Sequence, residues 1–136
     1  MKKKGFTLIE ILVVIGIIGL LAVFLVPNLL GAQDRAKEAA VKAVMHSLQL
    51  AVEAYNMEND SYPVARGAGI ENLCKNYLIG GGYIASVPKN PFTGKEYQDG
   101  DVAGRIVYDY NDVEGRYVLT GYKRNGTSKI IELSNM

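Results

Sequence analysis

A run without any charged side chain, from Ile11 to Gln33, constrains this chain more than any other feature. A surface helix of a soluble domain carries polar residues on its outer face, so this segment must be buried in lipid or against other protein. Phe6 to Leu25 counts 20 residues, and at about 1.5 Å per residue such a helix spans the roughly 30 Å of a bilayer's hydrocarbon. The sequence therefore predicts one membrane-spanning helix over residues 6–26.

Glu10 lies within the first turns of this apolar segment, where a carboxylate is costly. A charged side chain at the centre of a bilayer costs about 2.5 to 3.5 kcal/mol. Two explanations are open. The carboxylate can lie near the lipid headgroups at the helix N-terminus, where the helix dipole stabilises a negative charge by about 0.3 to 1 kcal/mol. Alternatively, a cut between Gly5 and Phe6 would create an α-amino group, with an ordinary pKa of about 7.7, that could neutralise Glu10 within one chain or between neighbours.

The residues around Glu10 resemble a known processing signal. Residues 2–5, Lys-Lys-Lys-Gly, followed by residues 6–10, Phe-Thr-Leu-Ile-Glu, are similar to the class III signal of type IV prepilins and type II secretion pseudopilins. In that family a membrane aspartyl peptidase cuts after the glycine and methylates the new N-terminal phenylalanine, and the glutamate pairs with the N-terminus of an adjacent subunit. The resemblance implies a cleaved leader ending at Gly5, N-methylation of Phe6 and a role for Glu10 in assembly.

A secretory signal peptide also has a basic start and an apolar core, but it is cut after the core at a small-x-small site. Residues 23–30 read Val-Phe-Leu-Val-Pro-Asn-Leu-Leu and offer no such site, so we expect the apolar segment to stay attached. Positive residues that flank the first apolar segment stay in the cytoplasm. With Lys2, Lys3 and Lys4 in this position, the N-terminus is expected in the cytoplasm and the C-terminal bulk outside it, in the periplasm.

Helical periodicity continues past the apolar run and predicts one helix over residues 6–55, about 75 Å long, which no bilayer requires. Pro27 removes a backbone donor, so the helix is expected to kink or loosen there. An apolar stripe that should pack on the C-terminal domain consists of Val41, Val44, Leu48, Ala51 and Tyr55. A second stripe, which either allows close helix approach or reflects the helix preference of alanine, consists of Ala32, Ala36, Ala39 and Ala43.

Residues 56–136 are expected to form a small globular head. A short helix is predicted within residues 67–78, and a proline-containing loop over residues 87–97. Asn125-Gly126 is a strong hairpin signal. Strands rich in Val, Ile and Tyr are predicted at residues 105–110, 116–122 and 129–133. The expected fold class is α+β, with the long helix packed on a three-stranded antiparallel sheet.

Charge and the rare residue types limit the functions to consider. With 15 basic and 14 acidic residues the net charge is +1, so we expect no nucleic acid partner. A weak basic cluster, interpreted as a solvated hairpin end, consists of Lys123, Arg124 and Lys129. The only cysteine, Cys74, cannot form an internal disulfide and is predicted to be a small buried apolar side chain. The only histidine, His46, is expected to be exposed, so catalytic constellations lack a second member and the chain is not expected to be an enzyme.

Tyr62-Pro63, the short helix and the proline-containing loop resemble the head of the major type II pseudopilin. That family binds calcium in a C-terminal loop through aspartates and carbonyls, but its glycine- and aspartate-rich tail is absent here. Calcium needs six to eight oxygen ligands. The candidate ligands are Asp99 and Asp101, or Asp109, Asp112 and Glu114, and the alternative is that these are solvated loop acids.

The resemblance implies a structural subunit that assembles with identical copies into a short fibre for protein export. The implied partners are a prepilin peptidase, an inner-membrane assembly platform with its ATPase, and minor pseudopilins. Such a subunit is a single-pass inner-membrane protein before assembly and part of a periplasmic or cell-surface fibre afterwards. Two alternatives remain: a type IV pilin for adhesion, twitching motility or DNA uptake, and a monomeric membrane-tethered binding domain.

Overall fold

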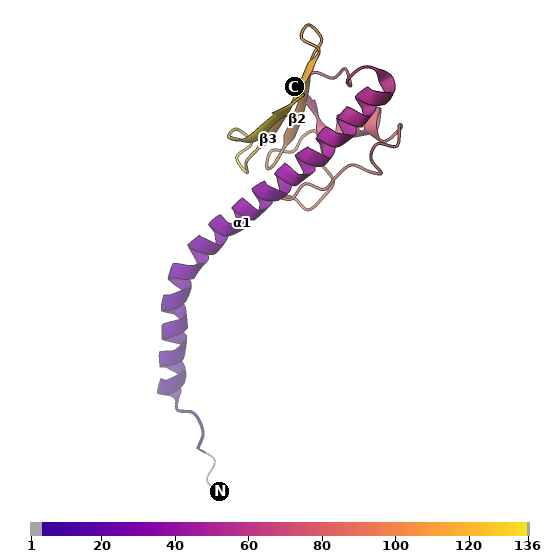
Figure 1. Ribbon diagram of the computed structural model, residues 1–136. Coiled ribbons are helices and arrows are strands. Elements are labelled where there is room, and N and C mark those ends of the chain that lie inside the picture. The colour runs from indigo at the N-terminus through magenta and orange to yellow at the C-terminus, as the bar shows by residue number, and fades with distance from the viewer. Residues whose placement is uncertain (1–3, 136) are drawn as a thin grey trace. The chain divides into compact units, whose positions relative to one another are not determined.

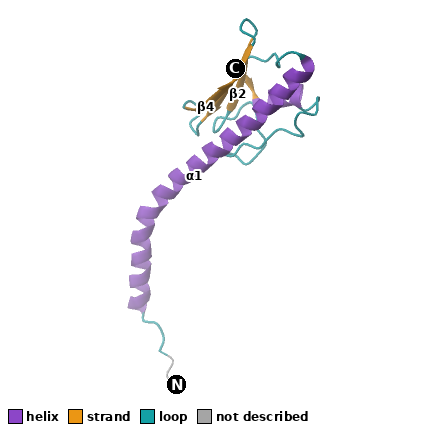
Figure 2. Ribbon diagram, in the orientation of Figure 1, coloured by secondary structure: helices purple, strands orange, loops and turns teal. Residues whose placement is uncertain are grey.

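The computed structural model describes residues 4–135; residues 1–3, which hold Lys2 and Lys3 of the predicted leader, and Met136 lie outside this range. The chain divides into two compact units at Arg35 and Ala36, and each is described by itself. One long helix runs through both, and a small sheet belongs to the second (Figures 1 and 2). The elements in chain order are α1 (Leu8–Asn59), β1 (Ala68–Gly69), α2 (Ile70–Leu73), η1 (Cys74–Leu78), β2 (Ile106–Asn111), β3 (Arg116–Tyr122) and β4 (Lys129–Ser134).

Helix α1 has 52 residues, beginning at Leu8 rather than Phe6 and ending at Asn59 rather than Tyr55. It continues through Pro27, so the weakening expected there does not interrupt it. Proline cannot donate the backbone hydrogen bond of that turn. One residue further on, the side-chain amide of Asn28 donates to the carbonyl of Phe24 at 3.2 Å. The membrane-length apolar segment and the amphipathic segment are therefore parts of one helix.

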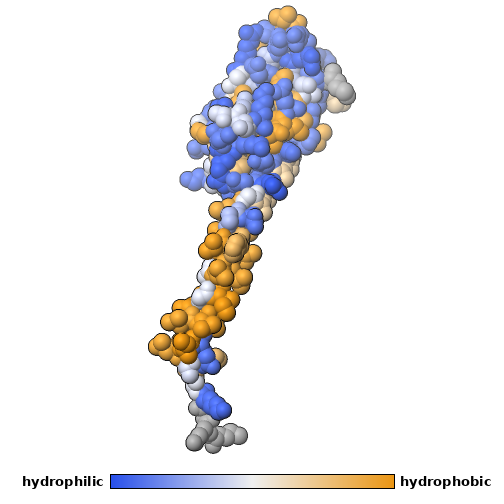
Figure 3. Space-filling model, turned by 90° about the vertical axis from the view of Figure 1, so that its left-hand side faces the viewer, coloured by the Kyte–Doolittle hydropathy of each residue, from blue (hydrophilic) through white to orange (hydrophobic). Residues whose placement is uncertain are grey.

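The apolar segment of α1 finds no cover within its own unit. All residues from Lys4 to Gln33 are exposed, and the helix is long and apolar enough to cross a membrane. Figure 3 shows apolar side chains gathered around this segment, whereas the visible surface of the head is mostly hydrophilic. Because exposed apolar surface on this scale is unfavourable in water, the segment requires lipid or other protein chains around it.

The sheet is antiparallel, with strand order β1-β2-β3-β4. Its last three strands agree with the predicted ones to within one residue at each end. One further strand, β1, was not predicted. It has only two residues, Ala68 and Gly69, which pair with Tyr108 and Val107 of β2. The predicted short helix is also present, as α2 followed by the π-helical turn η1. The structure thus confirms the α+β class and corrects the strand number from three to four.

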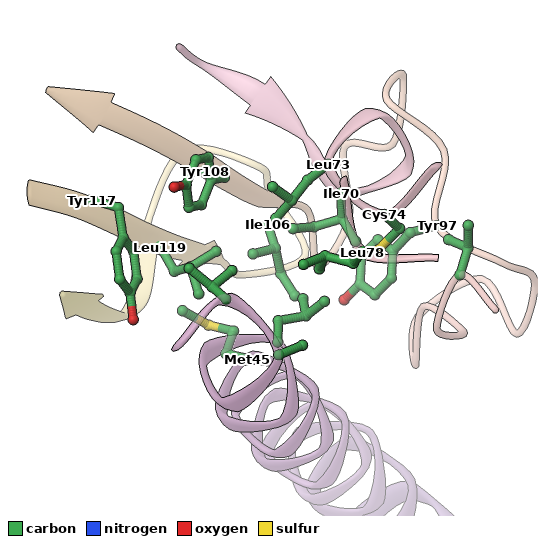
Figure 4. Packing of buried hydrophobic residues seen from close by; sticks show 14 of the residues in the cluster. Met45, Ile70, Leu73, Cys74, Leu78, Tyr97, Ile106, Tyr108, Tyr117 and Leu119 are labelled. Atoms are coloured by element: carbon green, nitrogen blue, oxygen red, sulfur yellow. The ribbon is translucent and has the colours of Figure 1, made fainter. Parts of the chain in front are cut away.

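The second half of α1 lies on one face of the sheet and supplies much of the core (Figures 1 and 4). Its buried residues are Val41, Met45, Leu48, Ala51 and Val52. Val44 and Tyr55 of the predicted stripe are only half-buried at its edge. Met45 and Val52 were not predicted, because the buried face of α1 is rotated towards them relative to the predicted stripe. From β2 and β3 the core receives Ile106, Tyr108, Tyr117 and Leu119.

Gly121 of β3 allows α1 to approach the sheet closely. A Cβ atom at this position would lie 2.4 Å from Sδ of Met45. We expect Gly121→Ala to displace Met45 and to lower the free energy of unfolding by about 1 to 3 kcal/mol. Gly100→Ala is the matched control, because a Cβ there meets nothing within 4 Å. Urea unfolding of the detergent-solubilised chain measures both variants, and equal midpoints would contradict the close packing of α1 on β3.

Tyrosine hydroxyls join the core to the loops around it. The hydroxyl of Tyr108 donates to the carbonyl of Pro63 at 2.9 Å, and that of Tyr97 donates to the carbonyl of Gly104 at 2.9 Å. The rings of Tyr108 and Tyr117 stack with centroids 5.6 Å apart. The neutral hydroxyls therefore serve both as apolar bulk and as hydrogen-bond donors.

Alkaline pH should unfold the head. Burial raises the pKa of Tyr97, Tyr108 and Tyr117 above the ordinary 10.0, and that of the Cys74 thiol from 9.0 to about 12. The unfolded chain releases these protons at the ordinary values while the folded head retains them, so the free energy of unfolding falls as pH rises from about 9. Urea midpoints at a series of pH values measure this effect. A midpoint that is unchanged between neutral pH and pH 11 would contradict the burial of these groups.

Candidate processing and assembly site

The first turn of α1 is closed by Thr7 and Glu10. The backbone N–H of Thr7 donates to Oε2 of Glu10 at 2.7 Å, and the Thr7 hydroxyl donates to the same oxygen at 2.8 Å. In return, the backbone N–H of Glu10 donates to Oγ1 of Thr7 at 3.4 Å. Thr7 directly precedes the first helical residue, Leu8, so this reciprocal pair is a capping box. It satisfies backbone donors that would otherwise be unpaired at a helix N-terminus.

The capping box explains how the chain tolerates an acid at position 10. Glu10 lies at the end of the helix where the dipole favours a negative charge, which agrees with the first of the two explanations. Both bonds from Thr7 use a single oxygen, Oε2. A carboxylate offers about four lone pairs, so capping leaves capacity for a cation from elsewhere. The second explanation, pairing with an N-terminal amine, is therefore compatible with this geometry.

Gly5 and Phe6 lie just before the helix, in neither helix nor strand, and both are exposed. The Phe6 side chain is 82% exposed, and a Cβ on Gly5 would meet nothing within 4 Å. Exposed, irregular backbone of this kind is where proteolysis occurs most readily. A shallow apolar groove on the same unit is lined by Phe6, Ile9, Glu10, Val13 and Val14. The predicted cleavage point, the predicted methylation point and the acid thus lie together on one short segment.

Two of the three predicted calcium ligands, Asp109 and Asp112, have partners within the chain. Asp112 forms an ion pair with Arg66, whose side chain holds the pKa of that carboxyl below its usual value. Oδ1 of Asp109 accepts the backbone N–H of Gly67 at 2.8 Å, and Glu114 is exposed. Within residues 4–135 no group of three or more His, Cys, Asp or Glu side chains is placed to hold a metal ion. Calcium binding by Asp109, Asp112 and Glu114 stays a prediction.

The other candidate acids are also engaged with the chain. Oδ1 of Asp99 accepts the backbone N–H of Asn72 at 3.2 Å. Oδ2 of Asp101 accepts from the side-chain amide of Asn90 at 2.9 Å. These carboxylates hold loops of the head together through donors distant in sequence. In this structure they act as hydrogen-bond acceptors between loops.

Sequence reasoning missed two polar residues that hold the structure together. Glu53 of α1 accepts hydrogen bonds from the hydroxyls of Tyr62 at 3.0 Å and Tyr117 at 2.7 Å. Its partners lie 9 and 64 residues further along the chain, beyond the reach of a helical spacing, so no local signal marks it. Thr7 did have a signal, because Thr-x-x-Glu before an apolar run is typical of a capping box.

The remaining predictions for single residues agree with the structure. His46 is exposed and Cys74 is buried. In the predicted basic cluster, Lys129 Nζ lies 2.6 Å from an oxygen of Glu132. Lys123 Nζ lies 3.9 Å from an oxygen of Glu38. Both lysines are thus paired within the chain.

A capped helix with an exposed apolar half, preceded by a basic segment and an accessible Gly-Phe bond, is the architecture of a prepilin-like membrane subunit. Residues 1–26 match the family described as "Prokaryotic N-terminal methylation motif", and residues 28–109 match "Type II secretion system (T2SS), protein G". The chain belongs to the type II secretion system protein G family, the family of major pseudopilins. This is a family of structural proteins rather than enzymes, and membership favours the secretion branch over the type IV pilins.

Several similar proteins carry the name "Type II secretion system core protein G". The Vibrio cholerae protein is 39% identical over 71% of this chain and 70% of its own length. The Klebsiella pneumoniae protein is 37% identical, over 71% of this chain and 74% of that protein. The Escherichia coli K12 protein is 40% identical, over 71% of this chain and 70% of that protein. No solved structure matches this chain.

Proposed function

We propose that this chain is made as a precursor, loses residues 1–5 by cleavage between Gly5 and Phe6, is methylated on Phe6, and then polymerises as the major subunit of a type II secretion pseudopilus. The observation that carries the proposal is the exposed apolar half of α1, continuous with a half that forms the core of the head. A simple anchor needs only the first half. A subunit that stores its helix in lipid and later bundles it with identical helices needs both.

Glu10 is proposed to direct this polymerisation. Cleavage would create an ammonium group on Phe6, and the acid of one subunit would pair with that group on its neighbour. Pairing offsets the cost of about 2.5 to 3.5 kcal/mol of a lone charge in the membrane. The capping box supports this role, because it fixes the carboxylate at the helix end nearest the new N-terminus while leaving lone pairs for the ammonium.

The proposal includes a location and partners. Before assembly the chain is a single-pass inner-membrane protein, with its N-terminus in the cytoplasm and its head in the periplasm. The basic residues at positions 2–4 support this orientation. A prepilin peptidase processes the precursor, and an assembly platform with its ATPase and minor pseudopilins builds the fibre. The fibre then moves folded exoproteins towards the cell exterior.

Two measurements test the proposal. The intact mass of the native protein, isolated from cells that contain the peptidase, should equal that of residues 6–136 with one hydrogen replaced by a methyl group. Deletion of the gene should leave folded exoproteins in the periplasm, and the intact gene should restore their export. A native protein that still begins at Met1, or secretion that is unaffected by the deletion, would refute the proposal. Abundant long surface fibres, sheared from cells at ordinary expression, would instead favour a type IV pilin.

A further inference from the structure

Hydrogen bonds within the chain close the β3–β4 hairpin. Oδ1 of Asn125 accepts the backbone N–H groups of Thr127 and Ser128 at 3.1 and 3.0 Å, and its amide donates to Oγ of Ser128 at 2.9 Å. The N–H of Gly126 donates to the carbonyl of Lys123 at 2.9 Å, and the N–H of Lys123 donates to the carbonyl of Ser128 at 2.8 Å. Gly126 has a φ of +70°, a conformation that favours glycine.

The hairpin also packs tightly against the loop before β2. Gly126 is buried, and a Cβ on it would lie 2.6 Å from Cγ1 of Val102. The N–H of Gly104 donates to the carbonyl of Lys123 at 3.3 Å. In that loop, Oδ2 of Asp101 is occupied by the amide of Asn90 and by the backbone N–H of Gln98 at 3.2 Å. Two donors of this chain therefore already engage Oδ2 of Asp101.

Three cationic side chains meet where the hairpin faces α1. The guanidinium carbon of Arg124 lies 5.5 Å from the centre of the Phe92 ring, and Nζ of Lys37 lies 5.7 Å from the same centre. Nζ of Lys123 lies 3.9 Å from Oε2 of Glu38. Cations over an aromatic face are attracted to it electrostatically. We call the set formed by Lys37, Glu38, Phe92, Lys123 and Arg124 the cationic clasp.

We propose that the cationic clasp fixes the C-terminal hairpin of the head in place of the calcium ion that the family resemblance implies, so that this head folds independently of calcium. The clasp contains three cationic side chains and one carboxylate, Glu38, which lies beside Lys123, so the clasp itself is a poor site for a divalent cation. The protein G family match ends at residue 109, so β3, β4 and the hairpin lie beyond the matched residues. This inference goes beyond the proposed function and does not depend on whether the chain forms a fibre.

The first test compares the full detergent-solubilised chain in EGTA and in excess CaCl₂. We expect the same Tm in both conditions. An ion that binds only the folded state raises Tm in proportion to its excess over the dissociation constant. A Tm higher in calcium by more than about 5 °C would overturn the proposal.

The second test removes the clasp charges with Lys123→Ala/Arg124→Ala. Hydrogen exchange of residues 122–129 should accelerate at least about tenfold, equally in EGTA and in calcium, because local opening becomes easier. Lys89→Ala/Lys95→Ala is the matched control, since it removes two charges from exposed loop positions. Far-UV circular dichroism confirms that each variant is folded. Unchanged exchange in the clasp variant, or slower exchange on adding calcium to the wild type, would overturn the proposal.

Discussion

Replacing Glu10 with alanine should abolish fibre assembly while leaving the chain in the membrane. Removal of a carboxylate from the apolar segment should not impair insertion, because a charged side chain in lipid is unfavourable. Assembly changes in the opposite direction, because an ammonium buried at a subunit contact loses its partner, which costs about 3 to 5 kcal/mol. At 1.4 kcal/mol per factor of ten, cross-linked or sheared polymer should therefore fall at least about a hundredfold. Alkaline carbonate extraction measures insertion, and cross-linking in cells measures assembly.

Glu10→Gln separates the two roles of this side chain. Glutamine can replace glutamate in a capping box, so the helix N-terminus remains capped while the charge is lost. We expect this variant to fail in assembly as alanine does. Normal assembly of Glu10→Gln would show that capping, and not charge pairing, is what Glu10 contributes. Lys42→Ala, at an exposed position of the same helix, is the control that should assemble normally.

Asn90→Ala should strongly destabilise the head. The Asn90 side chain is fully buried and donates to Oδ2 of Asp101 and to the carbonyl of Ala103, both at 2.9 Å. Its Oδ1 accepts the backbone N–H of Phe92 at 2.9 Å. Alanine leaves these groups without their partner, at about 1 to 3 kcal/mol for each one that stays buried. The expected loss is roughly 3 kcal/mol, which lowers Tm by more than about 10 °C.

Asn76→Ala is the matched control for this loss. Asn76 is exposed, and its amide donates to the side-chain oxygen of Asn72 at 3.1 Å within one helical turn. An exposed bond of this kind exchanges readily with water, so Tm should change little. Thermal unfolding of the two variants beside the wild type is the measurement. If both variants melt at the wild-type temperature, the loop from residue 88 to residue 104 is not organised around Asn90.

The sequence predicted the framework of the head because its signals are local. Alternating Val, Ile and Tyr placed β2, β3 and β4, and helical spacing placed Val41, Leu48 and Ala51 in the core. Features set by contacts between distant segments were not predictable. The pair of residues in β1 becomes a strand only by pairing with β2. Asn90 reads as an ordinary loop residue, because its importance comes from partners that the fold brings around it.

In the candidate site, too, the local features were predictable from the sequence and the contacts between distant residues were not. Gly5, Phe6 and Glu10 stand out at fixed spacing, and the structure adds that Thr7 and Glu10 cap the helix together. The calcium candidates were chosen from the family resemblance and from acids close together in the sequence. That choice could not foresee Arg66 beside Asp112, because 46 residues separate the two in the chain.

The residues of α1 that are buried in the head begin at Val41, well beyond the membrane-length segment. The core of the head therefore contains no residue of the apolar segment, and it loses none when that segment changes its surroundings. In the proposed assembly, the apolar segment exchanges its lipid contacts for protein contacts, and the folded core of the head stays unchanged.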